Sequence, residues 1–151
     1  MKRVSIFLIA FSMILGLFFA FSLTCLAAGV TTNEASSNVV FGEMNRIVFS
    51  WTSNASGAAS GSTTMDYSGV IYRVVFEPGS GATQPTNLYD VTLTDDDGID
   101  ILDGAGGDLS NTTTEQLQGL VGVSAVANSK LTLTVSNAGS SKTGTVVVYL
   151  R

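Results

Sequence analysis

Histidine is absent from this 151-residue sequence, and Cys25 is the only cysteine. These absences exclude Ser-His-Asp and Cys-His nucleophilic sites and the usual zinc sites from the chain that follows Cys25. They also exclude a disulfide within the chain, so a folded domain here is held by its core alone. A pair of carboxylates acting on a glycoside remains formally open, with Asp66, Glu77 and Asp90 as its possible members. Nothing in the sequence brings two of these together, and we therefore predict that the protein is not an enzyme.

Basic residues are scarce as well, with seven Lys and Arg against twelve Asp and Glu. Two of the seven, Lys2 and Arg3, stand at the start of the chain, and the part from Gly29 onward has a net charge of −7. Binding to nucleic acid relies on basic side chains that neutralise phosphates, and anionic lipid headgroups attract the same side chains. The charge therefore disfavours nucleic acid and anionic membrane surfaces as partners, and it favours solubility.

Residues 1–28 have the pattern of a targeting segment. Lys2-Arg3 precedes an uncharged, mostly apolar run from Val4 to Ala28, and Cys25-Leu26-Ala27 offers small residues at the −3 and −1 positions of a cleavage site. The run is also long enough to span a bilayer as a hydrophobic helix. A cleaved signal peptide and a retained membrane anchor over residues 4–28 both stay open, and a lipid anchor on Cys25 is a third reading.

The rest of the chain divides into a polar linker over residues 29–37 and one domain over residues 38–151. Period-2 alternation with β-branched and aromatic residues predicts strands with one buried face. The clearest case is residues 70–76, where Val70, Tyr72, Val74 and Phe76 alternate with their neighbours. Strands are also expected over residues 38–42, 46–52, 58–67, 89–94, 99–102, 121–126, 131–136 and 143–150.

Turn signals separate these strands at spacings of about ten residues. Asp95-Asp96-Asp97-Gly98 predicts a tight hairpin turn with residues 99–102 as its return strand, and residues 127–129 predict another turn. Residues 112–119 fit a short helical turn or an irregular crossing. Both faces of residues 143–150 are apolar, which places this strand centrally in a sheet. The fold class predicted is all-β, a single antiparallel β-sandwich of jelly-roll or immunoglobulin-like type, with seven to nine short strands after the N-terminal hydrophobic helix.

Trp51 is the only tryptophan, and it shares one strand face with Ile47 and Phe49. Because its neighbours on that face are apolar, we expect Trp51 to be a core residue, as we expect for Phe76. The alternative is that Trp51 is a platform on which a sugar ring stacks. An exposed tryptophan would favour that alternative.

Seven aspartates fall within nineteen residues: Asp90, Asp95, Asp96, Asp97, Asp100, Asp103 and Asp108. Carboxylate oxygens are the ligands that calcium prefers, so this cluster is the one candidate metal site. Its weak calcium candidates are Asp95, Asp97, Asp100, Asp103 and Asp108. Their spacing fits no calcium loop, because an EF-hand glycine at Gly98 or Gly104 would put Leu93 or Ile99 where an aspartate is needed. We therefore expect a solvated acidic turn, with no metal and no cofactor.

Three strings carry a family resemblance: WTSNASGAASG, then YRVVFEPGSGATQPTNLYDVTLTDDDGIDILDGAGGDLSN, then LTLTVSNAGSSKTGTVVVYLR. Over about residues 39–151 they resemble a group of small structural proteins of tailed phages and prophages. The matching residues belong to the scaffold, among them Pro78, Gly79, Pro85, Tyr89, Asp90, Asp97 and Gly98.

The resemblance implies a non-enzymatic virion component, such as a capsid decoration or fibre protein. Its partners would be virion neighbours or other copies of itself, and its location the virion, with the start codon misplaced. If the leader is real, the protein is instead exported or membrane-anchored. It would then act as a surface binding or adhesion module that touches the membrane only through residues 4–28.

Overall fold

The computed structural model describes residues 28–39, 42–118 and 125–151. Within them the chain forms nine strands and one short 3₁₀ helix, which confirms the all-β class. The elements are β1 (Gly29–Val39), β2 (Gly42–Thr52), β3 (Ala59–Ser62), β4 (Tyr67–Pro78), η1 (Gly81–Thr83), β5 (Asp90–Thr94), β6 (Glu115–Gln118), β7 (Ala125–Ser129), β8 (Thr132–Ser136) and β9 (Thr143–Leu150). The expected hydrophobic helix over residues 4–28 lies almost wholly outside the described residues. Across the part that is described, no helix has the length and apolar character needed to cross a bilayer.

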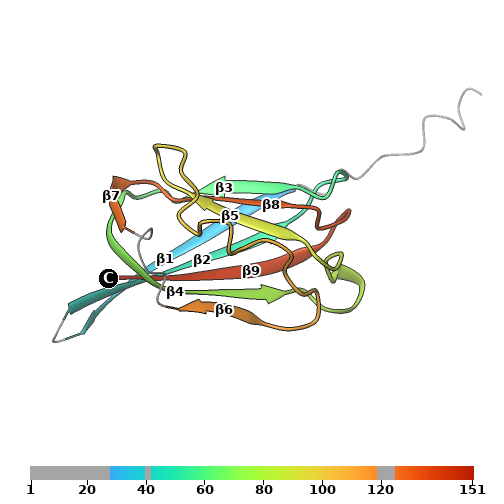
Figure 1. Cartoon of the computed structure of the whole chain (residues 1–151), viewed down its shortest axis with the longest axis horizontal. Coiled ribbons are helices and arrows are strands. Elements are labelled where there is room, and N and C mark those ends of the chain that lie inside the picture. The colour runs from blue at the N-terminus through green and yellow to red at the C-terminus, as the bar shows by residue number, and fades with distance from the viewer. Residues whose placement is uncertain (1–27, 40–41, 119–124) are drawn as a thin grey trace, which may run out of the picture.

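The strands form two antiparallel sheets (Figure 1). The larger sheet has the order β1-β2-β9-β4-β6, and β7 pairs with the first residues of β4. The smaller sheet has the order β3-β8-β5. Strand β9 lies between β2 and β4, as its two apolar faces predicted. Val146, Val147 and Val148 are all at most 3% exposed, so both faces of β9 are covered.

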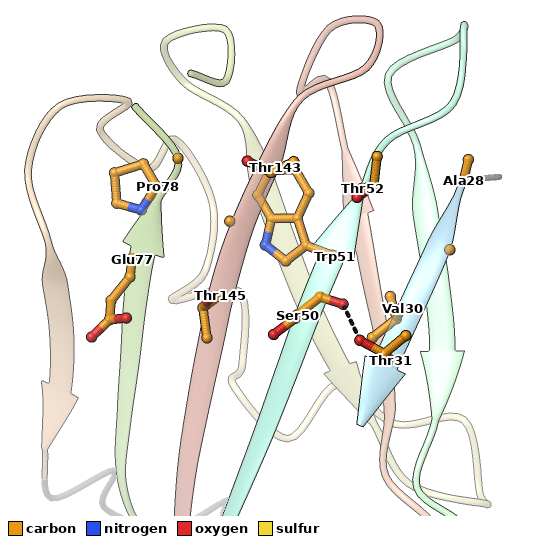
Figure 2. A pocket seen from close by; sticks show the side chains of 13 residues that line it. Ala28, Val30, Thr31, Ser50, Trp51, Thr52, Glu77, Pro78, Thr143 and Thr145 are labelled. Atoms are coloured by element: carbon orange, nitrogen blue, oxygen red, sulfur yellow. Dashed lines mark hydrogen bonds between the residues drawn. The ribbon is translucent and has the colours of Figure 1, made fainter. Parts of the chain in front are cut away.

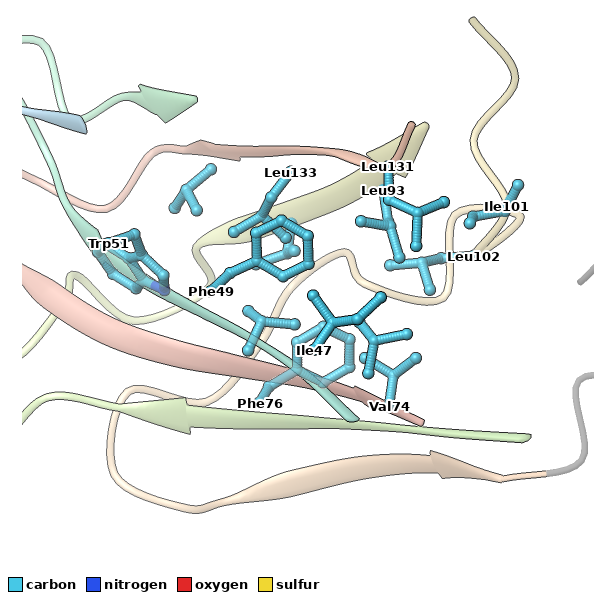
Figure 3. Packing of buried hydrophobic residues seen from close by; sticks show 14 of the residues in the cluster. Ile47, Phe49, Trp51, Val74, Phe76, Leu93, Ile101, Leu102, Leu131 and Leu133 are labelled. Atoms are coloured by element: carbon cyan, nitrogen blue, oxygen red, sulfur yellow. The ribbon is translucent and has the colours of Figure 1, made fainter. Parts of the chain in front are cut away.

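One hydrophobic cluster holds the two sheets together (Figure 3). It contains Phe49 and Phe76 from the larger sheet and Leu133 from the smaller one, each at most 1% exposed. Trp51 is 2% exposed, which confirms it as a core residue and is inconsistent with a stacking platform on the surface. Its ring centroid lies 5.7 Å from that of Tyr89, so this aromatic pair links β2 to the chain entering β5.

The indole of Trp51 lies directly over Gly144 in the neighbouring strand. A Cβ atom at position 144 would stand 2.5 Å from Cζ2 of Trp51, closer than packed carbon atoms approach. The glycine is therefore needed to leave space for the ring.

Residues 29–37, which we expected to be a polar linker, form most of β1 and pair with β2 in continuous register from Gly29↔Thr52 to Val39↔Gly42. The expected strand over residues 38–42 becomes the end of β1 and the start of β2, with residues 40–41 outside the described residues. A strand at the edge of an antiparallel sheet needs few apolar residues, because its outward face meets water. For that reason the polar composition of residues 29–37 did not reveal a strand.

Three further predictions need correction. The strand expected over residues 58–67 is only β3, Ala59–Ser62. The helical turn or irregular crossing expected over residues 112–119 contains β6, Glu115–Gln118, which pairs with the apolar strand β4. The turn expected at residues 127–129 lies within β7, and most of the strand expected over residues 121–126 falls outside the described residues.

Candidate functional site

The acidic segment after β5 covers the free edge of that strand. Residues 99–109 run alongside β5 and satisfy the backbone groups that point away from β8. Three hydrogen bonds do this, from Ile101 N to Leu93 O (2.8 Å), from Val91 N to Gly106 O (2.8 Å) and from Leu109 N to Tyr89 O (2.9 Å). An uncovered edge strand invites pairing with another chain, so this segment seals one edge of the smaller sheet.

The tight turn predicted at Asp95–Gly98 is present, with a 3.1 Å hydrogen bond from Gly98 N to Asp95 O and φ of 77° at Gly98. The return strand predicted over residues 99–102 is wrong. Only an isolated bridge between Thr94 and Asp100 follows the turn. In a return strand, a backbone carbonyl oxygen would accept the hydrogen bond from Leu93 N. Here the Asp100 carboxylate accepts it instead, at 3.1 Å.

Asp100 organises this segment through three backbone donors. Its Oδ1 accepts from Leu93 N at 3.1 Å and from Leu102 N at 3.2 Å, and its Oδ2 accepts from Gly104 N at 3.0 Å. Asp95 plays the same part in the turn, since its Oδ1 accepts from Asp97 N and Ile99 N, both at 3.1 Å. These carboxylates hold loop backbone in place.

Two more aspartates join the acidic segment to neighbouring loops. Asp90 accepts from Asp108 N at 3.0 Å and from Asn137 Nδ2 at 2.6 Å. Asp96 accepts from Lys130 N at 3.1 Å, while its own N–H donates to Ser129 Oγ at 2.7 Å. The aspartates are thus distributed over several loops, and no three acidic side chains among the described residues converge as a metal-ligand set.

The five calcium candidates accordingly divide into two groups. Asp95 and Asp100 face backbone N–H groups, whereas Asp97, Asp103 and Asp108 are exposed at the surface. The three carboxylates considered for glycoside chemistry are also separated. Asp66 directly precedes β4, Glu77 lies near the far end of that strand, and Asp90 begins β5 in the other sheet.

A second candidate site lies over one end of the larger sheet, where β1, β2, β9 and β4 run side by side (Figure 2). A cavity of about 570 Å³ opens there. We call it the outer groove and define it by its six polar side chains, Thr31, Ser50, Thr52, Glu77, Thr143 and Thr145. Val30, Trp51 and Pro78 also border it.

The strand register places four of these side chains in one row across the sheet. Thr31 pairs with Ser50, Ser50 with Thr145, and Thr145 with Glu77. Thr52 and Thr143 are paired two residues further along and lie on the same side, since side chains alternate along a strand. Five hydroxyl groups and one carboxylate therefore gather on one surface from four strands.

Among the described residues, few hydrogen bonds involve the polar side chains of the outer groove. Thr31 Oγ1 donates to the Ser50 carbonyl oxygen at 3.4 Å, and Glu77 is exposed. Trp51 is buried in the core, and its indole Nε1 has no hydrogen-bond partner among the described residues. Because side chains alternate along β2, the indole lies on the core face, on the other side of the sheet from Ser50 and Thr52.

Sequence reasoning missed the outer groove. The signal available was the polar half of the alternation, with Ser50 and Thr52 opposite Trp51, and Thr143 and Thr145 opposite Val146. What joins these residues is the strand order, and nothing local in the sequence tells which strands are neighbours.

Tyr89, behind Trp51, is 1% exposed, and its burial, reinforced by the negative charge of Glu115, raises the pKa of the phenol from 10.0 to about 12. Only the neutral phenol is favoured in the folded state. Its contribution to stability is therefore complete below the unfolded pKa of 10.0 and is lost as the pH rises toward about 12.

We expect the free energy of unfolding to fall by about 1.3 kcal/mol from about pH 9 to about pH 11 because of Tyr89. Urea unfolding at the two pH values measures this difference. Tyr89→Phe is the matched control, because it keeps the ring and removes the ionisable group. An equal fall in the variant would contradict the assignment.

Comparison of this chain with models of protein families, with curated proteins and with solved structures finds no match. The functional argument therefore rests on the residues and on the geometry above.

Proposed function

We propose that this protein is a non-enzymatic structural protein that assembles with protein neighbours, of the capsid decoration or fibre type that the sequence resemblance implies. The two sheets with their shared core support a β-sandwich of jelly-roll or immunoglobulin-like type as its scaffold. One observation carries the proposal, namely a strand pair that extends past the rest of the larger sheet.

This extension is the far end of the β1–β2 hairpin (Figure 1). Strand β2 pairs with β9 only from Asn45 to Thr52, whereas its pairing with β1 continues to Gly42. The part beyond Asn45 is thus a ribbon of two strands. Such a ribbon is marginally stable alone in water, and packing against a neighbouring protein would stabilise it. We call residues 36–39 and 42–45 the hairpin arm.

The sealed edge of β5 supports the same proposal. A protein that assembles in an ordered way needs to block unwanted strand pairing while leaving defined contacts free. Here residues 99–109 cover one edge of the smaller sheet, and the hairpin arm extends from the larger sheet.

Removal of the hairpin arm should abolish self-association and leave the fold intact. Replacing residues 36–45 by Asn-Gly joins Ala35 to Arg46, which already face each other in register, through a two-residue turn. Light scattering after size-exclusion chromatography, at matched concentrations, should show oligomers for the unaltered protein and monomers for the variant. Near-equal melting temperatures would show that the domain is intact. A monomeric unaltered protein, or a variant that assembles equally well, would count against a self-assembling component.

The outer groove favours a second candidate function, an exported or membrane-tethered β-domain that acts as a surface binding or adhesion module. The leader distinguishes the two. Mature protein that begins near Ala28 and is found outside the cell would favour the second function, and co-purification with phage particles would favour the first.

A further inference from the structure

Two arginines flank a tyrosine on the outer face of the larger sheet. Arg46 of β2 and Arg73 of β4 are both paired with Tyr149 of β9, so the three residues form a row across neighbouring strands (Figure 1). The residues next to them in sequence, such as Ile47 and Val148, belong to the core. Because side chains alternate along a strand, the row points away from the core. We call these three residues the arginine row.

The arginine row is fixed in place and lacks an acidic partner. The guanidinium of Arg73 lies over the ring of Tyr149, with its Cζ 4.9 Å from the ring centroid. Arg73 is half-buried, and its Nε is covered and has no hydrogen-bond partner among the described residues. Covering part of a charge is unfavourable unless an opposite charge lies close by. Within the part of the chain that the structure describes, neither Arg46 nor Arg73 forms a salt bridge. A carboxylate from another molecule would supply the missing partner.

Exposed apolar side chains adjoin the arginine row on β4. Val70 and Tyr72 are 52% and 64% exposed. Tyr72 is the extra residue of a bulge, because Ile71 and Arg73 pair with consecutive residues of β9. A bulge redirects a side chain, and tyrosine and arginine are enriched among the residues that carry binding energy at protein interfaces. The row also begins where the hairpin arm ends, so the two form one continuous surface for a protein neighbour.

The acidic segment has a matching surface. Asp97 and Asp103 are exposed, and Ile99, which lies between them in the sequence, is 62% exposed. An apolar side chain is thus flanked by carboxylates here, whereas apolar side chains adjoin arginines on β4. A guanidinium binds a carboxylate through two parallel hydrogen bonds, which makes such a pairing both strong and specific.

The two surfaces lie on different sides of one molecule. The arginine row faces outward from the larger sheet, and the acidic segment borders β5 in the smaller sheet, with the core between them. They therefore do not pair within one copy. A contact between unlike surfaces of two copies leaves one of each surface free, so the same contact can repeat and build a ring or a filament.

We infer that the arginine row of one copy binds the acidic segment of the next copy, with Arg46 and Arg73 facing Asp97 and Asp103. The partner is a second copy of this chain because each copy carries both complementary surfaces. This inference rests on the proposed self-assembly and adds the surface that the neighbouring copy recognises.

Charge reversal on either surface tests the contact, with assembly of the full-length protein followed by light scattering. Arg46→Glu with Arg73→Glu, and separately Asp97→Lys with Asp103→Lys, should each raise the concentration needed for assembly about a hundredfold, since like charges would face each other. An equal mixture of the two variants brings opposite charges together again and should assemble. Melting temperatures check the fold. Because Arg73 is half-buried, Arg46→Glu alone is a second variant, at an exposed position, and should weaken assembly in the same direction.

Lys142→Glu is the matched control. It makes the same change in net charge as Arg46→Glu, but Lys142 directly precedes β9, whereas Arg46 pairs near the other end of that strand. It should leave assembly unchanged. Unchanged assembly in the charge-reversal variants, equal weakening by Lys142→Glu, or a mixture of folded variants that does not assemble would overturn the inference. The proposed function would survive these results if the unaltered protein forms oligomers that are lost with the hairpin arm. A monomeric unaltered protein would overturn both.

Discussion

Replacing Phe76 by alanine should lower the free energy of unfolding by about 3–5 kcal/mol. The side chain is 1% exposed and lies in the cluster that joins the two sheets, on a strand paired with the central strand β9. Truncation removes most of a large apolar side chain and leaves a cavity that its packed neighbours cannot fill. An effect of this size is a large part of the total stability of a small domain.

Tyr72→Ala provides the matched control on the same strand, because Tyr72 is 64% exposed. Its cost should stay within about 0.5 kcal/mol. Urea unfolding followed by the fluorescence of Trp51, the only tryptophan, measures both variants. The native emission should be blue-shifted and should move to the red on unfolding. Equal costs for the two variants, or a native spectrum typical of indole in water, would contradict the core described here.

Asp100→Ala should cost about 2–4 kcal/mol, since a carboxylate that serves three backbone donors is lost and hydrogen bonds to charged groups are worth about 1.5–3 kcal/mol each, though not additively. The donors are Leu93 N, Leu102 N and Gly104 N. Leu93 and Leu102 are fully buried residues, so water cannot readily replace the lost acceptor. Asp100→Asn should cost less, because the amide keeps one acceptor oxygen. Some cost should remain, because the amide nitrogen cannot replace the second carboxylate oxygen as an acceptor.

Asp97→Ala is the control for this second prediction, since Asp97 is exposed in the same acidic turn and should tolerate the change within about 0.5 kcal/mol. Thermal melts with and without calcium at constant ionic strength test the competing role. We expect no shift. If the acidic segment bound calcium, a calcium concentration one hundred times the dissociation constant would raise the free energy of unfolding by about 2.7 kcal/mol. A rise of that size, lost in Asp97→Asn or Asp108→Asn, would make the acidic segment a metal site.

Part of the core was predictable because burial leaves a local trace. The buried face expected over residues 70–76 is only half right, because Val74 and Phe76 are buried whereas Val70 and Tyr72 are 52% and 64% exposed, with a shift of register between Ile71 and Arg73. Alternation alone placed Ile47, Phe49 and Trp51 on one face, and the two apolar faces of residues 143–150 placed that strand in the centre of a sheet. Both results depend on the same rule. Side chains alternate between the two faces of a strand, and each face that packs against other parts of the protein is apolar.

The rest depends on contacts between distant parts of the chain. Residues 29–37 are polar and nevertheless form a strand, because β2 provides the pairing and only one face needs burial. Asp100 behaves as a substitute for a missing strand, which no spacing rule reveals. The outer groove combines residues as far apart as Thr31 and Thr145, and only the order of the strands brings them together.

The position of β9 also bears on when the chain can fold during its synthesis. Strand β9 is made after the other described strands, yet it is the strand that joins β2 to β4. Until it leaves the ribosome, the two halves of the larger sheet have no common partner, and the cluster around Phe49 and Phe76 stays open. Contacts between parts of a chain so far apart also form slowly. The growing chain thus remains without its native sheet until β9 has been made, and during that time it is exposed to chaperones, to proteases and to any machinery that moves unfolded chains.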